Sequence, residues 1–335
     1  LVGSEMCIRD RANEDSSEYK IIGSVEELMN EINISIKDGN MKSNPFSSFE
    51  IGNMSDENYD NIDLHKDIVD QIILSSSNGL PMKREKDIID VWFESGSMPY
   101  AQIHYPFENK DLIDKQINFP ADFIAEGVDQ TRGWFYTLHA ISCLSFNSIS
   151  YKNVVSNGLV LDKNGQKMSK RLGNAIDPFE MINEYSADAV RWYMISNSNP
   201  WDNLKFDIEG VAEVKRKFFG TLQNVYSFFS LYANIDNFKY DEDKIDVVKR
   251  PELDRWIISE INSLAKKVDY NLDNYDLTPA ARDINDFVQE KLSNWYVRLS
   301  RRRFWKGEYN QDKISAYQTL HECLMKISKL ISPIA

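Results

Sequence analysis

NVVSNGLVLDKNGQKMSKRLGNAIDP, residues 153–178, joins three kinds of local structure. The apolar residues of 153–161 predict a strand, which ends in a polar turn around Gly165. Asp177 and Pro178 then predict the N-cap and the first turn of a helix. A strand that leads through a polar loop into a helix is typical of α/β folds, whose ligands bind at the carboxyl ends of the strands.

The polar loop carries three cations within five residues, Lys167, Lys170 and Arg171, around Met168 and Ser169. Like charges so close together repel one another, and a solvated surface turn tolerates that repulsion. A loop that binds phosphates would instead need this cluster of positive charge, because flexible lysine ammonium groups suit a moving pyrophosphate. The Walker A pattern is absent, so this is no P-loop. Both interpretations stay open at this point.

Two earlier stretches predict further strands of the same kind. Asp87–Phe93 predicts a short buried strand with a turn at 94–96, and Ala121–Ala125 predicts a second strand. The second runs through Glu126 and Gly127 into a helix whose apolar residues recur at helical spacing: Trp134, Leu138 and Ile141. Strands alternating with helices predict a parallel α/β sheet.

The pattern becomes helical after Phe206. Long amphipathic segments cover 208–235, 252–273 and 278–305, and a last helix continues toward Ala335. Their short connections predict antiparallel neighbours in an α-helical bundle. Near the start, Ser24–Glu27 predicts a capping box that opens a short helix, and residues 40–60 predict a loop.

Composition limits the possible functions. The 335 residues allow about two domains, and a net charge of −13 argues against a protein held to nucleic acid by its overall charge. Three widely separated cysteines indicate a reducing compartment, and four histidines without metal-ligand spacing predict no metal site. No apolar run reaches the ~18 residues that a membrane span needs.

Both ends indicate a fragment. The chain begins at Leu1 with LVGSEMCIRDR, which resembles translated sequencing-adapter DNA, and it ends inside a helical pattern. We therefore expect residues 1–19 to be a non-native or disordered leader outside the fold.

Polar and aromatic side chains cluster where the predicted strands end. Glu126, Gly127, Asp129 and Gln130 follow the second strand, where carboxylates can accept hydrogen bonds from ribose hydroxyls and Gly127 admits a ligand close to the backbone. The alternative is an acidic first turn favoured by the helix dipole. Two tryptophans flank the strand ends and predict either walls of an apolar pocket or ordinary core: Trp92 and Trp134.

NWYVRLSRRRFWKGE, residues 294–308, places a basic cluster near the end of a helix. Arg298, Arg301 and Arg302 predict contacts with a phosphate backbone, because aromatic residues are interleaved with them. Basic residues also suit a helix C-terminus and a solvated face, and this second interpretation stays open.

Together these segments resemble a class I aminoacyl-tRNA synthetase, and within that class the isoleucyl-tRNA synthetases. Lys167–Arg171 looks like the class's Lys-Met-Ser-Lys-Ser loop, with Arg171 in place of the last Ser. The segments DVWFESGSMPYAQ (90–102) and FIAEGVDQTRGWF (123–135) are sharper. The valyl and leucyl relatives have different residues where this chain has Gln130, Arg132, Gly133 and Trp134. The resemblance covers about residues 20–335.

The resemblance implies a Rossmann-like catalytic domain and a two-step reaction: ATP and isoleucine give isoleucyl-adenylate, whose acyl group moves to tRNA(Ile). Residues 167–171 (Lys167, Met168, Ser169, Lys170 and Arg171) would bind ATP, with Lys167 and Lys170 catalytic and Met168 beside the adenine. Glu126, Gly127, Asp129 and Gln130 would hold the adenylate. Trp92 and Trp134 would line the isoleucine pocket, and Arg298, Arg301 and Arg302 would bind tRNA.

The resemblance also implies the organisation of the chain. The catalytic half would span 20–208, a connecting helix and linker 209–250, and the truncated anticodon-binding helices 251–335. Mg²⁺ would arrive with ATP, the fragment would hold no metal, and any zinc module would lie beyond Ala335. Half of the ATP site would lie before Leu1, so we expect the fragment to be inactive alone. We expect a cytoplasmic location, no membrane and no oligomer.

Two other functions are compatible with the sequence. One is a non-catalytic tRNA-binding truncation product. The other is a valyl-tRNA synthetase or a different adenylyl-transferring enzyme with a similar loop. The helices after residue 206 disfavour the adenylyl-transferring enzyme, because small adenylyltransferases do not need them.

Overall fold

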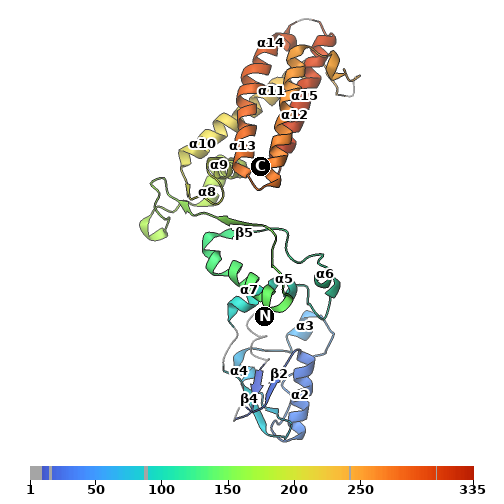
Figure 1. Ribbon diagram of the computed structural model, residues 1–335, viewed down its shortest axis with the longest axis vertical. Coiled ribbons are helices and arrows are strands. Elements are labelled where there is room, and N and C mark those ends of the chain that lie inside the picture. The colour runs from blue at the N-terminus through green and yellow to red at the C-terminus, as the bar shows by residue number, and fades with distance from the viewer. Residues whose placement is uncertain (1–9, 15–16, 87–89, 241–242, 307) are drawn as a thin grey trace. The chain divides into compact units, whose positions relative to one another are not determined.

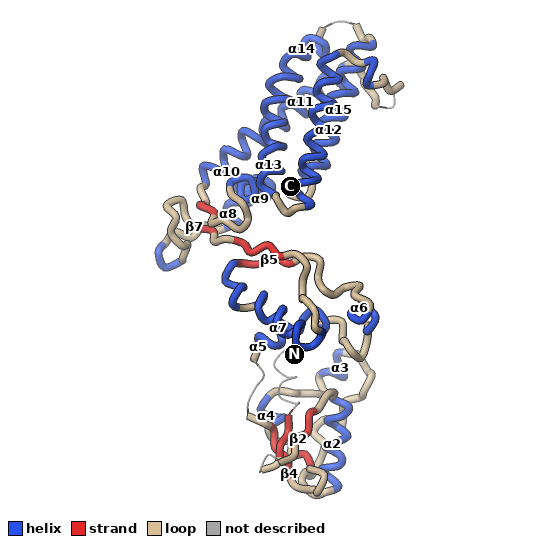
Figure 2. Tube along the Cα trace, viewed as in Figure 1, coloured by secondary structure: helices blue, strands red, loops and turns tan. Residues whose placement is uncertain are grey.

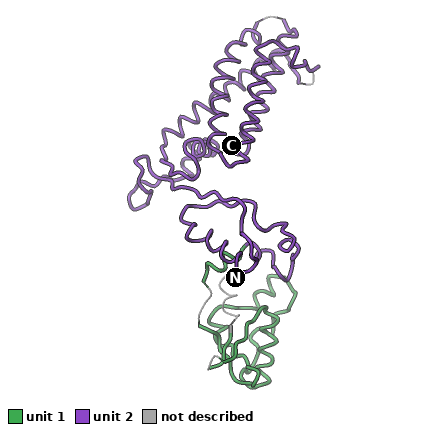
Figure 3. The backbone as a smooth tube through the Cα atoms, in the orientation of Figure 1, with its two compact units in different colours: residues 1–98 green, residues 99–335 purple. Residues whose placement is uncertain are grey.

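The computed structural model describes residues 10–14, 17–86, 90–240, 243–306 and 308–335. Its contacts divide the chain into two units, residues 1–98 and 99–335 (Figure 3). No helix among the described residues combines the length and the apolar character that crossing a membrane requires.

The first unit is built on a four-stranded antiparallel sheet in the order β2-β1-β4-β3. Helix α2 begins at the predicted capping box, where Ser24 Oγ accepts a hydrogen bond from the Glu27 amide. Leu28 and Ile32 of this helix are buried in the core of the unit. The elements are β1 (Asp10–Ala12), β2 (Tyr19–Ile21), α2 (Val25–Lys37), α3 (Asp56–Tyr59), α4 (Lys66–Val69), β3 (Leu74–Ser75), β4 (Pro81–Arg84) and α5 (Val91–Ala101), which runs past the unit boundary.

Three expectations meet the structure of the first unit. Residues 10–12 of the expected leader form β1, which pairs with both β2 and β4 and buries Arg11 and Ala12. Residues 1–9 and 15–16 of that leader lie outside the described residues, and its non-native origin stays a prediction. The loop predicted at 40–60 contains one helical turn, α3. Residues 91–96 form the start of α5 instead of a strand end and a turn, because Asp90 accepts a hydrogen bond from the Trp92 amide (2.8 Å) and begins a helix there. Residues 87–89 of the predicted strand lie outside the described residues.

The first part of the second unit holds small parallel pairs of strands (Figure 2). β5 pairs directly with β6, and helix α7 connects the two strands along the chain. β7 pairs directly with β8, and helices α8 and α9 connect them. The expected α/β character with parallel strands is therefore confirmed, but the described strands form two separate pairs rather than one continuous sheet. The elements are α6 (Lys110–Asp114), β5 (Ile124–Gly127), α7 (Trp134–Phe146), β6 (Val154–Asn157), β7 (Val160–Leu161), α8 (Pro178–Tyr185), α9 (Ala187–Asn197) and β8 (Leu204–Lys205).

Helices make up the rest of the second unit, and α11 to α15 lie side by side (Figure 1). The segment 208–235 is helical throughout, with a π-helical stretch at Lys215–Phe219, and the predicted helix 252–273 is confirmed. Buried Ile257, Leu292 and Leu320 belong to one apolar core. The helices are α10 (Ile208–Val214), α11 (Gly220–Ile235), α12 (Glu252–Asp273), α13 (Leu277–Asp286), a π-helical stretch (Phe287–Val297), α14 (Arg298–Trp305) and α15 (Gln311–Ile331).

Candidate active site

The carboxyl ends of β5 and β6 lie side by side, because Gly127 pairs with Asn157 in the parallel register. This edge exposes the carboxylate of Glu126 and leads directly into the turn 128–132. The carboxyl ends of parallel strands are where open α/β folds bind their ligands. The structure thus places the predicted adenylate-binding residues at a strand edge that suits them.

Local contacts hold the turn after β5. A Cβ atom on Gly127 would lie 2.6 Å from Asp129 Oδ1, so only glycine fits here while Asp129 keeps its position. Gln130 donates to Asp129 Oδ2 (3.1 Å), and its Oε1 accepts from the amide of Trp134 at the start of α7 (3.0 Å). Asp129 and Glu126 are exposed, whereas the carboxamide of Gln130 holds its neighbours in place.

Gly158 joins β6 to β7 at a very close backbone approach. Its amide donates to Pro200 O (2.8 Å), and a Cβ atom there would lie 2.2 Å from Asp202 O. The next amide, of Leu159, donates to Asn203 Oδ1 (2.9 Å). These contacts fix the segment that follows α9 against the strands.

Asp162 and Asn174 organise the cationic loop. Asp162 Oδ1 accepts from the amides of Asn164 (2.9 Å) and Gln166 (2.8 Å), and its Oδ2 accepts from Asn174 Nδ2 (2.9 Å). The hydrogen bond from Asn174, followed by the bond from the Gln166 amide, lowers the pKa of Asp162 below its ordinary value. Asn174 also accepts from the Ser169 amide (2.9 Å) and donates to Lys167 O (3.3 Å). The backbone of the loop is therefore fixed at both ends.

The cations of the loop stay available to a ligand. Lys167, Lys170 and Arg171 are exposed, and no ion pair among the described residues involves them. Met168 is half-buried against an apolar cluster that includes Tyr193. An adenine contact by Met168 stays a prediction.

The two tryptophans belong to different units. Trp92 lies on α5 in the first unit and is 43% exposed, and Trp134 begins α7 in the second unit and is half-buried. Their shared role in a pocket stays a prediction.

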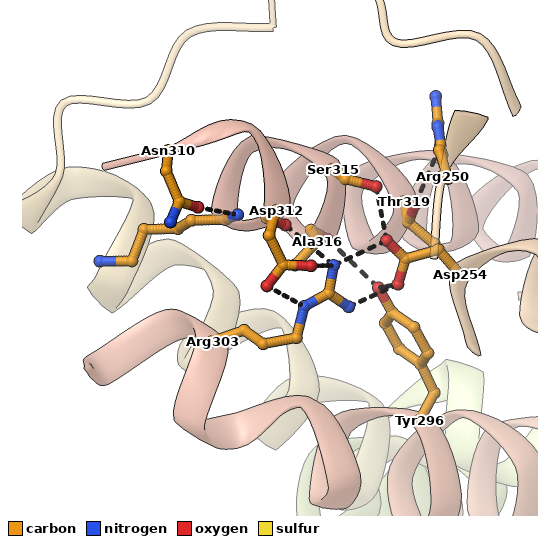
Figure 4. A network of polar contacts seen from close by, with 10 residues as sticks. Arg250, Asp254, Tyr296, Arg303, Asn310, Asp312, Ser315, Ala316 and Thr319 are labelled. Carbon is orange, nitrogen blue, oxygen red and sulfur yellow. Dashed lines mark hydrogen bonds and ion pairs between the residues drawn. The ribbon is translucent and has the colours of Figure 1, made fainter. Parts of the chain in front are cut away.

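The basic cluster of α14 separates into two groups. Arg298, Arg301 and Arg302 are exposed, whereas Arg303 points inward (Figure 4). Arg303 donates two hydrogen bonds to the fully buried Asp254 (2.6 and 2.9 Å) and also pairs with Asp312 (2.9 Å). Burial opposes the charge of Arg303, but the hydrogen bonds and charge of Asp254 outweigh it and raise the pKa of Arg303.

Asp254 receives two further hydrogen bonds, from Tyr296 Oη (3.0 Å) and Ser315 Oγ (2.5 Å) (Figure 4). Four donors satisfy this buried carboxylate, so the pair with Arg303 ties α14 to α12 and α15. Arg303 is thus a structural residue, and the three exposed arginines are the ones free to contact a phosphate backbone.

Sequence reasoning missed three residues that shape the site: Gly158, Asp162 and Asn174. Asp162 begins an Asp-x-x-Gly turn, a signal that the sequence did contain. The roles of Gly158 and Asn174 depend on partners far along the chain, Asp202 and Asp162, and no local pattern indicates them.

The models of two known protein families match segments of the chain. Residues 37–207 match the model described as tRNA synthetases class I (I, L, M and V), and residues 254–335 match the anticodon-binding domain of tRNA ligase. The chain belongs to the class I tRNA synthetases. No cluster of three or more His, Cys, Asp or Glu side chains in the part that the structure describes could hold a metal ion.

Several class I synthetases resemble the chain over most of its length. Isoleucine–tRNA ligases of Bacteroides fragilis and Porphyromonas gingivalis are 63% and 62% identical over 96% of the chain. The chain spans 28% of the length of each of these curated relatives.

Solved synthetase structures share the fold. The ternary LeuRS-tRNA-LeuAMS complex of Agrobacterium radiobacter K84 has a TM-score of 0.61 at 19% identity, covering 79% of the chain and 32% of that protein. Mycobacterium tuberculosis methionyl-tRNA synthetase with methionyl-adenylate has a TM-score of 0.60 at 18% identity, covering 78% and 50%.

Proposed function

We propose that the chain is part of an isoleucine–tRNA ligase, which forms isoleucyl-adenylate from ATP and isoleucine and transfers the isoleucyl group to tRNA(Ile). The observation that carries this proposal is the loop 162–174, an ordered turn that exposes Lys167 and Lys170 without ion-pair partners among the described residues. The identity of 63% to isoleucine–tRNA ligases supports isoleucine as the amino acid.

The two lysines act on the leaving group. The isoleucine carboxylate attacks the α-phosphorus of ATP, and negative charge grows on the pyrophosphate as its bond to that phosphorus breaks. Ammonium groups on a preorganised loop stabilise this charge without a cost of reorganisation at the moment of reaction. Ser169 and Arg171 contribute to ATP binding on the same loop. Mg²⁺ arrives with ATP as part of the substrate.

The strand edge after β5 holds the adenylate. Glu126 and Asp129 offer exposed carboxylates to ribose hydroxyls and to the ammonium group of isoleucine. Gly127 leaves room for the carboxylate of Asp129 beside the backbone, and Gln130 holds Asp129 and the start of α7 in place. Trp134, at the start of α7 next to this turn, provides an apolar wall for the isoleucine side chain.

The exposed arginines of α14 contact the tRNA backbone. Arg298, Arg301 and Arg302 present positive charge on one helix, and the pair of Arg303 with the buried Asp254 holds that helix against α12. Trp295 and Trp305 are exposed beside them and offer stacking surfaces. This local basic face attracts RNA although the net charge of the chain is −13.

The proposed division of the chain follows these roles. Residues 20–208 form the second half of a Rossmann-like catalytic domain, and strands from the part of the protein that the chain does not cover complete its sheet. Residues 209–250 connect it to an antiparallel helical bundle at 251–335 that binds the anticodon arm. Translation takes place in the cytoplasm, and we place the protein there.

The full-length gene product tests the proposal through exchange of labelled pyrophosphate into ATP. We expect exchange that depends on isoleucine and is far weaker with leucine or methionine at equal concentration. Exchange that depends on another amino acid, or none with any amino acid, would contradict the proposal. The second outcome together with retained tRNA binding would favour a non-catalytic tRNA-binding protein.

A further inference from the structure

Helix α9 belongs to two apolar cores at once. Trp192 stacks on Phe218 (4.3 Å between ring centroids) within the core of the helices α11 to α15. Tyr193, the next residue, lies in the cluster that supports Met168 of the cationic loop. Any displacement of α9 therefore acts on both the helical part and the loop.

The carboxyl end of α9 is bound by side chains from α13. The last carbonyl groups of a helix have no partner within the helix. Here Arg282 donates to Ser196 O (2.8 Å) and Asn197 O (2.7 Å), and the hydroxyl of Thr278 lies 2.7 Å from Ile195 O and 2.9 Å from Ser198 O. A single hydroxyl proton is shared between these two acceptors. The guanidinium charge also complements the negative end of the helix dipole.

The same end of α9 connects to the strands. Tyr193 Oη donates to Lys205 O (3.1 Å) in β8 and accepts from the Asp207 amide (3.1 Å). In the segment after α9, Pro200 O accepts a hydrogen bond from the amide of Gly158. β8 pairs in turn with β7, the strand that enters the cationic loop. Contacts thus run without a break from α13 through α9 to Met168.

We propose that Thr278 and Arg282 are positioning residues for adenylate formation: they hold the carboxyl end of α9 so that the loop 167–171 presents its lysines to the leaving pyrophosphate. This inference rests on the proposed function. It adds that two side chains of the anticodon-binding part set the rate of the first chemical step, although they do not touch ATP.

Arg282 offers a direct test because its side chain is exposed and its loss opens no cavity. In the full-length protein, Arg282→Met should slow single-turnover adenylate formation roughly 10- to 100-fold, as small displacements far from the chemistry can do. The Michaelis constants for ATP and isoleucine should change less than about twofold, since ground-state contacts stay intact. Arg282→Lys should recover part of the rate, because lysine still donates to a carbonyl and keeps the charge.

Matched variants separate positioning from general stability. Arg255→Met removes an exposed arginine from α12 and should leave the rate and the melting temperature unchanged. Thr278→Val should slow the reaction and Thr278→Ser should not, because only serine keeps the hydroxyl at this buried position. Equal effects of Val and Ser would overturn the role of the hydroxyl.

A double-mutant cycle with Lys170→Ala gives the decisive result. If Arg282 acts through the loop, Arg282→Met should slow adenylate formation only slightly in the Lys170→Ala background, because the lysine that Arg282 helps to position is then absent. If its effect is the same in both backgrounds, or if Arg282→Met does not slow the wild type, the inference fails while the proposed function stands. A full-length protein without isoleucine-dependent activation overturns both.

Discussion

At Gly158 a single residue shows how closely the site is packed. A Cβ atom would meet the carbonyl group of Asp202, with its oxygen at 2.2 Å and its carbon at 2.4 Å, so backbone would have to move. We expect Gly158→Ala to destabilise the chain by roughly 1–3 kcal/mol, the usual cost of overpacking. Urea unfolding of the 335-residue chain measures this. Gly220→Ala is the control, since its Cβ atom would make an ordinary contact and alanine favours a helix.

Residues with local roles could be predicted, and those with distant partners could not. Asp177 caps α8 through the Phe179 amide (2.8 Å), two residues away, as the sequence indicated. Arg303 looked like its neighbours in α14, and only the fold brings Asp254 to it. The same limit hid Asn174. The predicted roles of Glu126, Asp129 and the two lysines are compatible with the exposure of these side chains.

At the scale of elements, helix α14 exposes three arginines and directs the fourth, Arg303, toward the buried Asp254. Neutralising Arg298, Arg301 and Arg302 to Gln in the full-length protein should weaken tRNA binding. The slope of log affinity against log salt should flatten by about one unit per lost phosphate contact. Adenylate formation should be unchanged, because ATP is not bound there.

A matched triple variant controls for net charge. Lys37, Lys42 and Lys66 are exposed in the first unit, and changing them to Gln removes the same three charges. An equal flattening of the salt slope in both triple variants would mean that the three arginines lie on a solvated helix face and do not contact the tRNA backbone.

Elements with strong periodicity were predicted well, and short apolar runs were not. The helix 252–273 has a regular apolar face and was predicted with its bounds. Val91–Phe93 was expected to be a strand and is helical, because a run of so few apolar residues does not distinguish the two. Strand β1 was not predicted because residues 1–19 were placed outside the fold, and no local pattern connects it to its partners Lys83 and Arg84.

At the scale of the whole molecule, the chain spans 28% of the length of its isoleucine–tRNA ligase relatives. We expect the 335-residue chain to show no isoleucine-dependent exchange of pyrophosphate into ATP, because the proposed ATP site also needs residues from the part of its relatives that the chain does not span. The full-length protein assayed in parallel is the positive control. Exchange by the purified chain clearly above background would show that the described residues suffice for catalysis.

The central claim is that Lys167 and Lys170 stabilise the negative charge that grows on the leaving pyrophosphate. One measurement tests this claim most directly. Single-turnover kinetics of Lys170→Ala in the full-length protein should show adenylate formation slowed by about 10²–10³, the usual effect of losing one preorganised stabiliser, with little change in ATP binding. Transfer from preformed adenylate to tRNA should be far less affected, since no pyrophosphate is left to stabilise. Equal slowing of both steps would contradict the claim.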